Sequence, residues 1–158
     1  SIGQTRLIAR GLCPLELGVT GLAAALTELA AETRQRCGVA CRFSHGLDIC
    51  INDPFVATHL FRIAQEAVNN AVRHGQPRKV RIRLTRKGEQ ACLEIHDDGV
   101  GLPATRKTAT GLGLHTMKYR ADTIGGQLTV ERAQPRGLVV SCRVPLTGFA
   151  MPKPQTSK

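Results

Sequence analysis

IHDDGVGL, residues 95–102, joins the end of an apolar strand to two adjacent acids and two glycines spaced two residues apart. The alternation in ACLEIHD, which runs into it, is typical of a β-strand with one buried face. Because glycine has no Cβ atom, Gly99 and Gly101 let another group approach the backbone closely. The stretch therefore predicts that a strand ends at Asp97 and Asp98 and that another group lies close to the backbone there. Asp98 has the simpler alternative of only facing solvent.

A second strand precedes this one in the chain. RKVRIRLTRK, residues 78–87, alternates apolar and basic side chains and predicts a strand with one buried and one basic face. A turn at Lys87-Gly88 would join the two strands as a hairpin. The register of that hairpin leaves open whether Cys92 or Leu93 points inward together with Ile95.

A long helix lies before these strands. Asn52-Asp53-Pro54 predicts its start, because a capping side chain precedes proline at the first helical position. We expect it to run to about His74 and to be closed by Gly75, with Pro77 beyond. At about 100° per residue its apolar side chains fall on one face, which is the predicted core face. The opposite face carries a polar stripe only about 80° wide, which consists of His59, Arg62, Glu66, Asn70 and Arg73.

The remaining segments give a coarse order of elements. We expect a helix over 19–36, strands over 39–44 and 47–51 that pair as an edge hairpin, a helix over 114–124, and a closing hairpin over 127–146. GLPATRKTATGLG, residues 101–113, has no periodicity and predicts a loop. Helices gathered on one face of a mixed, mostly antiparallel sheet make an α+β fold, a two-layer α/β sandwich.

Composition limits the class of protein. With 158 residues the chain predicts one domain, and no apolar run is long enough to cross a bilayer. Lys and Arg outnumber Asp and Glu by 22 to 12, so a polyanion is favoured as a partner. Aromatic residues make up only 3%, which argues against base stacking and therefore against direct nucleic-acid binding. The six cysteines lack a CxxC pair, and we expect reduced thiols.

Three segments together resemble a known family. EAVNNAVRH (66–74), DDGVG (97–101) and GLGL (111–114) resemble the N, G1 and G2 boxes of the histidine-kinase-type ATPase domains, in the family's order. The resemblance implies the Bergerat fold, with ATP and Mg²⁺ as ligands. GLGLHTMKYRADTIGG and the short loop before it are most similar to sensor kinases that pair with LuxR-type response regulators. Ala109 departs from the pattern, because the longer G2 box has a glycine there.

The resemblance also implies roles for single residues. Asp97 would accept a hydrogen bond from the adenine amino group, beside Gly99 and Gly101. Asn70 would hold Mg²⁺, and Glu66 would polarise the attacking nucleophile. Arg73 would meet the phosphates, and the amides at the start of the helix that follows Gly113 would attract them. The predicted nucleotide-binding set is completed by His74, Leu102, Thr110, Gly111, Leu112 and Leu114.

The family further implies an organisation and a function. Residues 1–18 would be the end of a dimerisation helix and a linker, 19–147 the ATPase domain, and 148–158 a disordered tail. The expected activity is transfer of the ATP γ-phosphoryl group to a histidine on a dimerisation domain absent from this chain. The expected partners are that domain, in a homodimer, and a response regulator, in the cytoplasm. An anti-sigma-type serine kinase and a non-catalytic nucleotide-gated binding module are the alternatives on the same fold.

Overall fold

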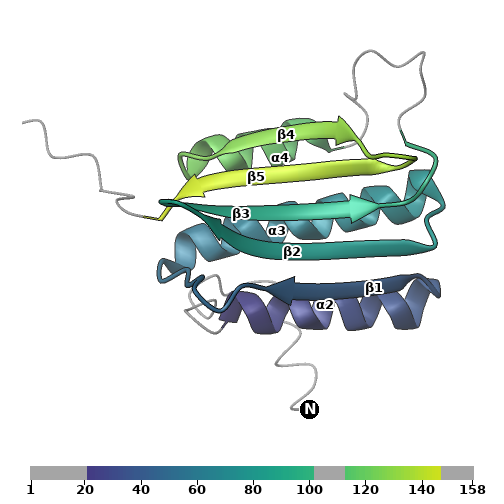
Figure 1. Ribbon diagram of the computed structural model, residues 1–158, viewed down its shortest axis with the longest axis horizontal. Coiled ribbons are helices and arrows are strands. Elements are labelled where there is room, and N and C mark those ends of the chain that lie inside the picture. The colour runs from purple at the N-terminus through teal and green to yellow at the C-terminus, as the bar shows by residue number, and fades with distance from the viewer. Residues whose placement is uncertain (1–20, 102–112, 147–158) are drawn as a thin grey trace, which may run out of the picture.

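The computed structural model describes residues 21–101 and 113–146. Three α-helices, one π-helical turn and five strands follow one another along the chain (Figure 1). In order they are α2 (Gly21–Cys37), β1 (Ala40–His45), α3 (Pro54–Asn70), η2 (Ala71–Gly75), β2 (Lys79–Lys87), β3 (Gln90–Asp97), α4 (Leu114–Thr123), β4 (Gln127–Arg132) and β5 (Leu138–Pro145). None of the helices in these ranges has the length and apolar content to span a bilayer.

The five strands form one sheet in the order β1-β2-β3-β5-β4. Every neighbouring pair is antiparallel except β1 and β2, which run parallel. The three α-helices all cover the same face of this sheet, and its other face is open (Figure 1). The predicted two-layer α+β sandwich with a mixed, mostly antiparallel sheet is therefore confirmed.

The predicted edge hairpin of 39–44 and 47–51 is wrong. Only its first strand forms, as β1, and it pairs in parallel with β2. The chain leaves the sheet where the Gly46 amide donates to the Leu84 carbonyl, 3.0 Å away. Leu47 then lies fully exposed, whereas Ile51 is buried in the core. Residues 47–51 instead form the connection to α3. Burial of the apolar Ile51 side chain in the core stabilises this path of the chain.

The register of β2 and β3 settles which side chains face the helices. Ile82 pairs with Ile95 and Leu84 with Leu93, and all four are buried in the core between the layers. Leu93 is thus the inward residue. Cys92 is fully buried too, but it belongs to the other face of the sheet and not to the core cluster.

Helix α3 begins as predicted and ends differently. The Asp53 side chain accepts a hydrogen bond from the Phe55 amide at 2.8 Å, and Pro54 occupies the first turn. The last turn is not α-helical but π-helical, from Ala71 to Gly75. The left-handed residue that ends it is Gln76, with φ 47°, and not the expected Gly75.

Burial confirms the predicted core face of α3, because its members from Val56 to Ala71 are all buried. The cysteines within the described ranges are free thiols, as expected. Cys13 and the predicted segments 1–18 and 148–158 lie outside the described residues, as does the loop from 102 to 112.

Candidate functional site

A cavity of about 240 Å³ lies between the helical layer and the end of β3. Its walls come from α3 and η2, from the stretch after β3, from the start of α4, and from β4 and β5. The lining residues are Ala67, Asn70, Ala71, His74, Gly75, Asp97, Val100, Gly101, Leu114, Met117, Val130, Leu138 and Val140. The volume is below the roughly 300–1,000 Å³ of pockets that enclose drug-sized ligands. The cavity therefore suits a planar, base-sized group and not a whole nucleotide.

Asp97 is the one carboxylate on this lining, and it is buried at the end of β3. Val80 pairs with Asp97 across the sheet, and Val80 faces the core, so the carboxylate points to the helical side. Its Oδ1 accepts a hydrogen bond from the Gly99 amide at 2.8 Å, and the Leu138 amide also donates to it. A fixed acceptor among apolar walls can discriminate for a ring that carries an amino donor.

Burial raises the pKa of the Asp97 carboxyl above its ordinary value, and the neighbouring charge of Asp98 adds to that rise. The amides of Gly99 and Leu138 act in the opposite direction. Because the pKa is raised on folding, ionising Asp97 costs the folded protein stability. The surroundings of the carboxyl thus favour its protonated form relative to a carboxyl in water.

This shift predicts a pH-dependent stability difference between the wild type and Asp97→Asn. Below the ordinary pKa of 3.8 the carboxyl is protonated in both states, and the wild type has its full stability. As the pH rises through 3.8 and then through the raised folded value, the unfolded chain ionises first and the wild type loses stability. In urea unfolding from pH 3 to pH 7, the unfolding free energy of Asp97→Asn should rise relative to that of the wild type. A gap that does not change with pH would contradict the prediction.

Asp98, the second acid of the pair, has a structural task. Its Oδ1 accepts hydrogen bonds from the amides of Arg78 and Lys79 at 2.8 and 2.9 Å. These bonds lower the pKa of the Asp98 carboxyl, and they tie the start of β2 to the turn after β3. The alternative that Asp98 only faces solvent is therefore wrong, because its carboxylate accepts hydrogen bonds from two backbone amides.

A backbone contact between η2 and the turn after β3 closes one side of the cavity. The Val100 amide donates to the Gly75 carbonyl at 2.9 Å. A Cβ atom on Gly99 would lie 2.4 Å from that same carbonyl oxygen. Gly99 is therefore required because the end of the long helix passes directly against it.

The turn between β4 and β5 packs against the backbone of Asp97. Gly137 has φ +100°, and a Cβ atom there would lie 1.8 Å from the Asp97 carbonyl oxygen. Next to it, Arg136 donates from Nε to the Gly99 carbonyl at 3.2 Å. The turn between β4 and β5 thus lies directly against the end of β3 and the residues that follow it.

Glu66, on α3, has its carboxylate against the start of α4. A Cβ atom on Gly113, whose φ is +66°, would be 2.2 Å from Glu66 Oε1, so the carboxylate lies directly against this residue. Gly113 is the N-cap of α4, where the partial positive charge of the helix end favours an acid. Glu66 therefore occupies the border between the cavity and the helix terminus that is predicted to meet phosphate.

The structure brings most of the predicted site together. Asn70, His74, Asp97, Gly101 and Leu114 line the cavity. Glu66, Gly99 and Gly113 lie at its border through the contacts above. Leu102, Thr110, Gly111 and Leu112 lie outside the described residues.

Arg73 is the exception, since it is exposed and does not line the cavity. The polar stripe includes Arg73 only if the helix keeps 100° per residue, but the chain is π-helical from Ala71 onward. A π-turn advances less per residue, which turns Arg73 outward and brings His74 to the cavity instead.

Comparison with known proteins identifies the fold's family. Residues 55–148 match the family described as histidine kinase-, DNA gyrase B-, and HSP90-like ATPase. The match takes in more than half of the chain and every wall of the cavity. The chain belongs to this ATPase family. The predicted resemblance is confirmed.

Named relatives of this ATPase domain are sensor histidine kinases. Sensor histidine kinase LiaS of Bacillus subtilis (strain 168) is 34% identical over 143 residues, which are 90% of this chain and 39% of LiaS. Sensor histidine kinase NarS of Mycobacterium tuberculosis is 36% identical over 142 residues, 85% of this chain and 32% of NarS. The chain thus spans no more than 39% of the length of either relative.

A solved structure has the same fold as the ATPase domain. It is the histidine kinase domain of the blue-light activated histidine kinase of Erythrobacter litoralis EL346. The TM-score is 0.66 at 25% sequence identity, over 79% of this chain and 61% of that one.

Sequence reasoning missed the apolar walls of the ATPase domain's cavity. Val130, Leu138 and Val140 form its floor on β4 and β5, and Met117 closes it from α4. Strand alternation could have marked the three sheet residues as inward, but it could not distinguish a cavity wall from ordinary core.

The described residues of the ATPase domain bring no three His, Cys, Asp or Glu side chains together as a metal cage. The amide oxygen of Asn70, which lines the cavity, nevertheless fits a hard cation such as Mg²⁺. Such an ion keeps several waters and takes further oxygens from phosphate, so a dedicated protein cage is not required.

Proposed function

We propose that this chain is the ATP-binding catalytic domain of a two-component sensor histidine kinase, located in the cytoplasm. The observation that carries the proposal is the buried Asp97 carboxylate at the end of an otherwise apolar, base-sized cavity. Adenine presents an amino donor to such an acceptor, and the apolar walls accommodate its faces. Residues 19–147 would form this domain, 1–18 the exit from the dimerisation helices, and 148–158 a tail.

The reaction would transfer the γ-phosphoryl group of ATP to a histidine on the dimerisation domain. The histidine nitrogen forms a bond to the γ-phosphorus while the bond to the β–γ bridging oxygen breaks, and ADP leaves. Catalysis of this kind depends on positioning and on neutralising charge. Asp97 fixes the base, and Glu66, beside the start of α4, polarises the attacking histidine. Mg²⁺, held by Asn70 and the phosphates, would neutralise the developing charge.

The acceptor is external to the described domain. All five histidines belong to the sandwich itself: His45 lies on β1, His59 on α3, His74 on η2, His96 on β3 and His115 on α4. The full protein would supply the acceptor from a homodimeric helical domain and would pass the phosphate to a LuxR-type response regulator.

The deciding experiment incubates the chain with γ-labelled ATP and the dimerisation fragment of its parent protein. A histidine kinase yields label on the fragment that acid removes and base does not. Label that is stable to acid would indicate a serine kinase instead. ATP binding without any labelled product would indicate a nucleotide-gated binding module.

Asn70 allows a prediction on the role of the metal. Asn70→Ala should weaken ATP binding roughly 10-fold in the presence of Mg²⁺ and leave it unchanged in EDTA, because a single metal-coordinating oxygen is lost. Isothermal titration with and without Mg²⁺ measures both values. Asn69→Ala is the matched control, since this neighbouring amide is exposed and does not line the cavity. Equal losses in the two variants, or a loss that persists in EDTA, would rule out the assignment.

A further inference from the structure

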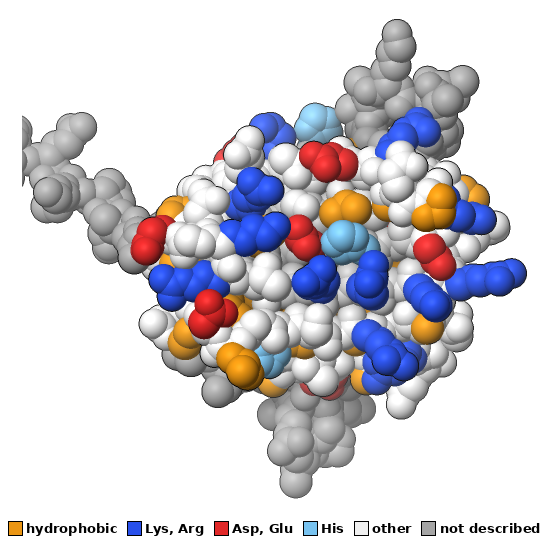
Figure 2. Space-filling view, in the orientation of Figure 1, with side chains coloured by type: hydrophobic (Ala, Val, Ile, Leu, Met, Phe, Trp, Pro, Cys, Tyr) orange, Lys and Arg blue, Asp and Glu red, His pale blue; other side chains and the backbone are white. Residues whose placement is uncertain are grey.

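The open face of the sheet has a second hollow, of about 790 Å³. It lies over the end of the sheet where β1 and β2 begin and β3 ends, beside the turn between β4 and β5. Its basic side chains are Arg42, Lys79, Arg81, His96 and Arg136, and we call this set the basic hollow. Figure 2 shows Lys and Arg side chains gathered over this end of β1 and β2.

The arrangement places like charges side by side. Arg42 pairs with Arg81 in the parallel register of β1 and β2, and Arg81 pairs with His96 across β2 and β3. Strands lie about 4.8 Å apart, so these three side chains form a row about 10 Å long. Arg42 and Arg81 are like charges in directly paired positions, and such pairs destabilise a sheet. The row therefore costs stability that an anion laid across it would restore.

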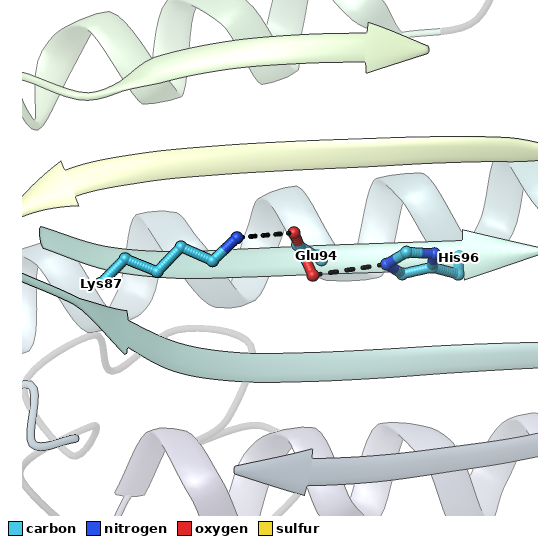
Figure 3. A network of polar contacts seen from close by, with 3 residues as sticks. All are labelled: Lys87, Glu94 and His96. Atoms are coloured by element: carbon cyan, nitrogen blue, oxygen red, sulfur yellow. Dashed lines mark hydrogen bonds and ion pairs between the residues drawn. The ribbon is translucent and has the colours of Figure 1, made fainter. Parts of the chain in front are cut away.

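The carboxylates that line or border the basic hollow all have hydrogen-bond partners. Asp97, which lines this hollow as well as the cavity, accepts from the Gly99 amide. Asp98 accepts from the amides of Arg78 and Lys79. Glu94 lies between Lys87, 3.5 Å away, and His96, 3.4 Å away (Figure 3). Arg42 and Arg81 are exposed and make no ion pair within the described part of the chain. Within the described residues, Arg42 and Arg81 are thus members of the basic hollow whose positive charge pairs with no carboxylate, in a chain of formal net charge +10.

We propose that the basic hollow binds an acidic segment of a partner protein. A single small anion cannot contact a row of about 10 Å, whereas carboxylates along a peptide repeat at comparable spacings. Single-stranded nucleic acid is disfavoured because its binding sites stack the bases on aromatic side chains. The exposed Phe55 and Tyr119 lie in the helical layer, and Phe43 is packed against the core. This site lies on the opposite face of the sheet from the candidate ATP cavity, and among the described residues the two share Asp97 in their linings.

The test measures binding of a fluorescein-labelled hexaglutamate peptide to the chain by anisotropy at low salt. Arg42→Glu combined with Arg81→Glu should weaken binding by at least about 10-fold, and added salt should weaken it in the wild type. Arg86→Glu is the control for the single variant Arg42→Glu, because it also reverses one charge but lies at a position of β2 that alternates to the other face. ATP affinity, measured in the same variants, should be unchanged and reports an intact fold.

A second readout comes from stability. Arg42→Glu alone replaces a repulsive pair by an attractive one, so its thermal midpoint should rise by about 1–2 °C while peptide binding falls. Unchanged hexaglutamate binding in the double variant would overturn the proposal. Tighter binding of octathymidylate through the same arginines, or displacement of the peptide by millimolar inorganic phosphate, would also overturn it, because the ligand would then be a nucleic acid or a small oxyanion.

Discussion

Replacing Asp97 by Asn is expected to weaken ATP binding roughly 30- to 150-fold, equal to ~2–3 kcal/mol, while the domain stays folded. The carboxylate offers acceptors only, and the Gly99 and Leu138 amides use part of its capacity. The rest is available to the amino group of adenine. Asn can keep the bond from Gly99, but then it presents an NH₂ donor to that amino group. Two donors face each other in a buried cavity, and neither is satisfied.

Isothermal titration of ATP into Asp97→Asn tests this, with Asp98→Asn as the control. Both variants remove one negative charge from the same turn, but Asp98 bonds to backbone amides and does not line the cavity. Binding should therefore fall in the first variant and change little in the second. If both lose affinity equally, charge and not hydrogen bonding explains the effect. If Asp97→Asn binds ATP normally, the assignment of the cavity fails.

Gly137→Ala is expected to cost about 3–5 kcal/mol of unfolding free energy, a large loss for the addition of a single methyl group. Gly137 has φ +100°, and the new Cβ would lie 1.8 Å from the Asp97 carbonyl oxygen and 2.7 Å from its carbon. Both atoms belong to the backbone of β3, so they cannot rotate away. The strand end must move, and the carboxylate that lines the cavity moves with it.

Gly88→Ala separates the two causes of this loss. Gly88 also has positive φ, +62°, but a Cβ atom there would have nothing within 4 Å. This variant should lose only the backbone term, about 1–2 kcal/mol. Urea denaturation of both variants gives the difference, which measures the clash. Equal losses would show that the turn at Gly137 yields freely and does not fix Asp97.

Local patterns are sufficient for the β2–β3 hairpin and for the carboxylate at its end. Strict alternation in β2 and β3 determines which residues face the helices, and the acid at the strand end is apparent from the order of residues alone. Partner choice is not local. Residues 47–51 have the apolar content of an edge strand. Whether β1 pairs with them or with β2 depends on the path of α3, which brings β2 next to β1. The π-turn after Asn70 similarly leaves no mark in the sequence, and it moves Arg73 away from the site.

The mixed pairing of the sheet has a consequence for the order of assembly. Lys87 pairs with Gln90 across a tight turn, whereas Ala40 must find Lys79 across the whole of α3. Closing the longer loop costs more chain entropy, so we expect the β2–β3 hairpin to form early and β1 to dock late. By the same reasoning β1 is the first strand to detach in native-state fluctuations, and its amide protons should exchange with solvent ahead of those in β3.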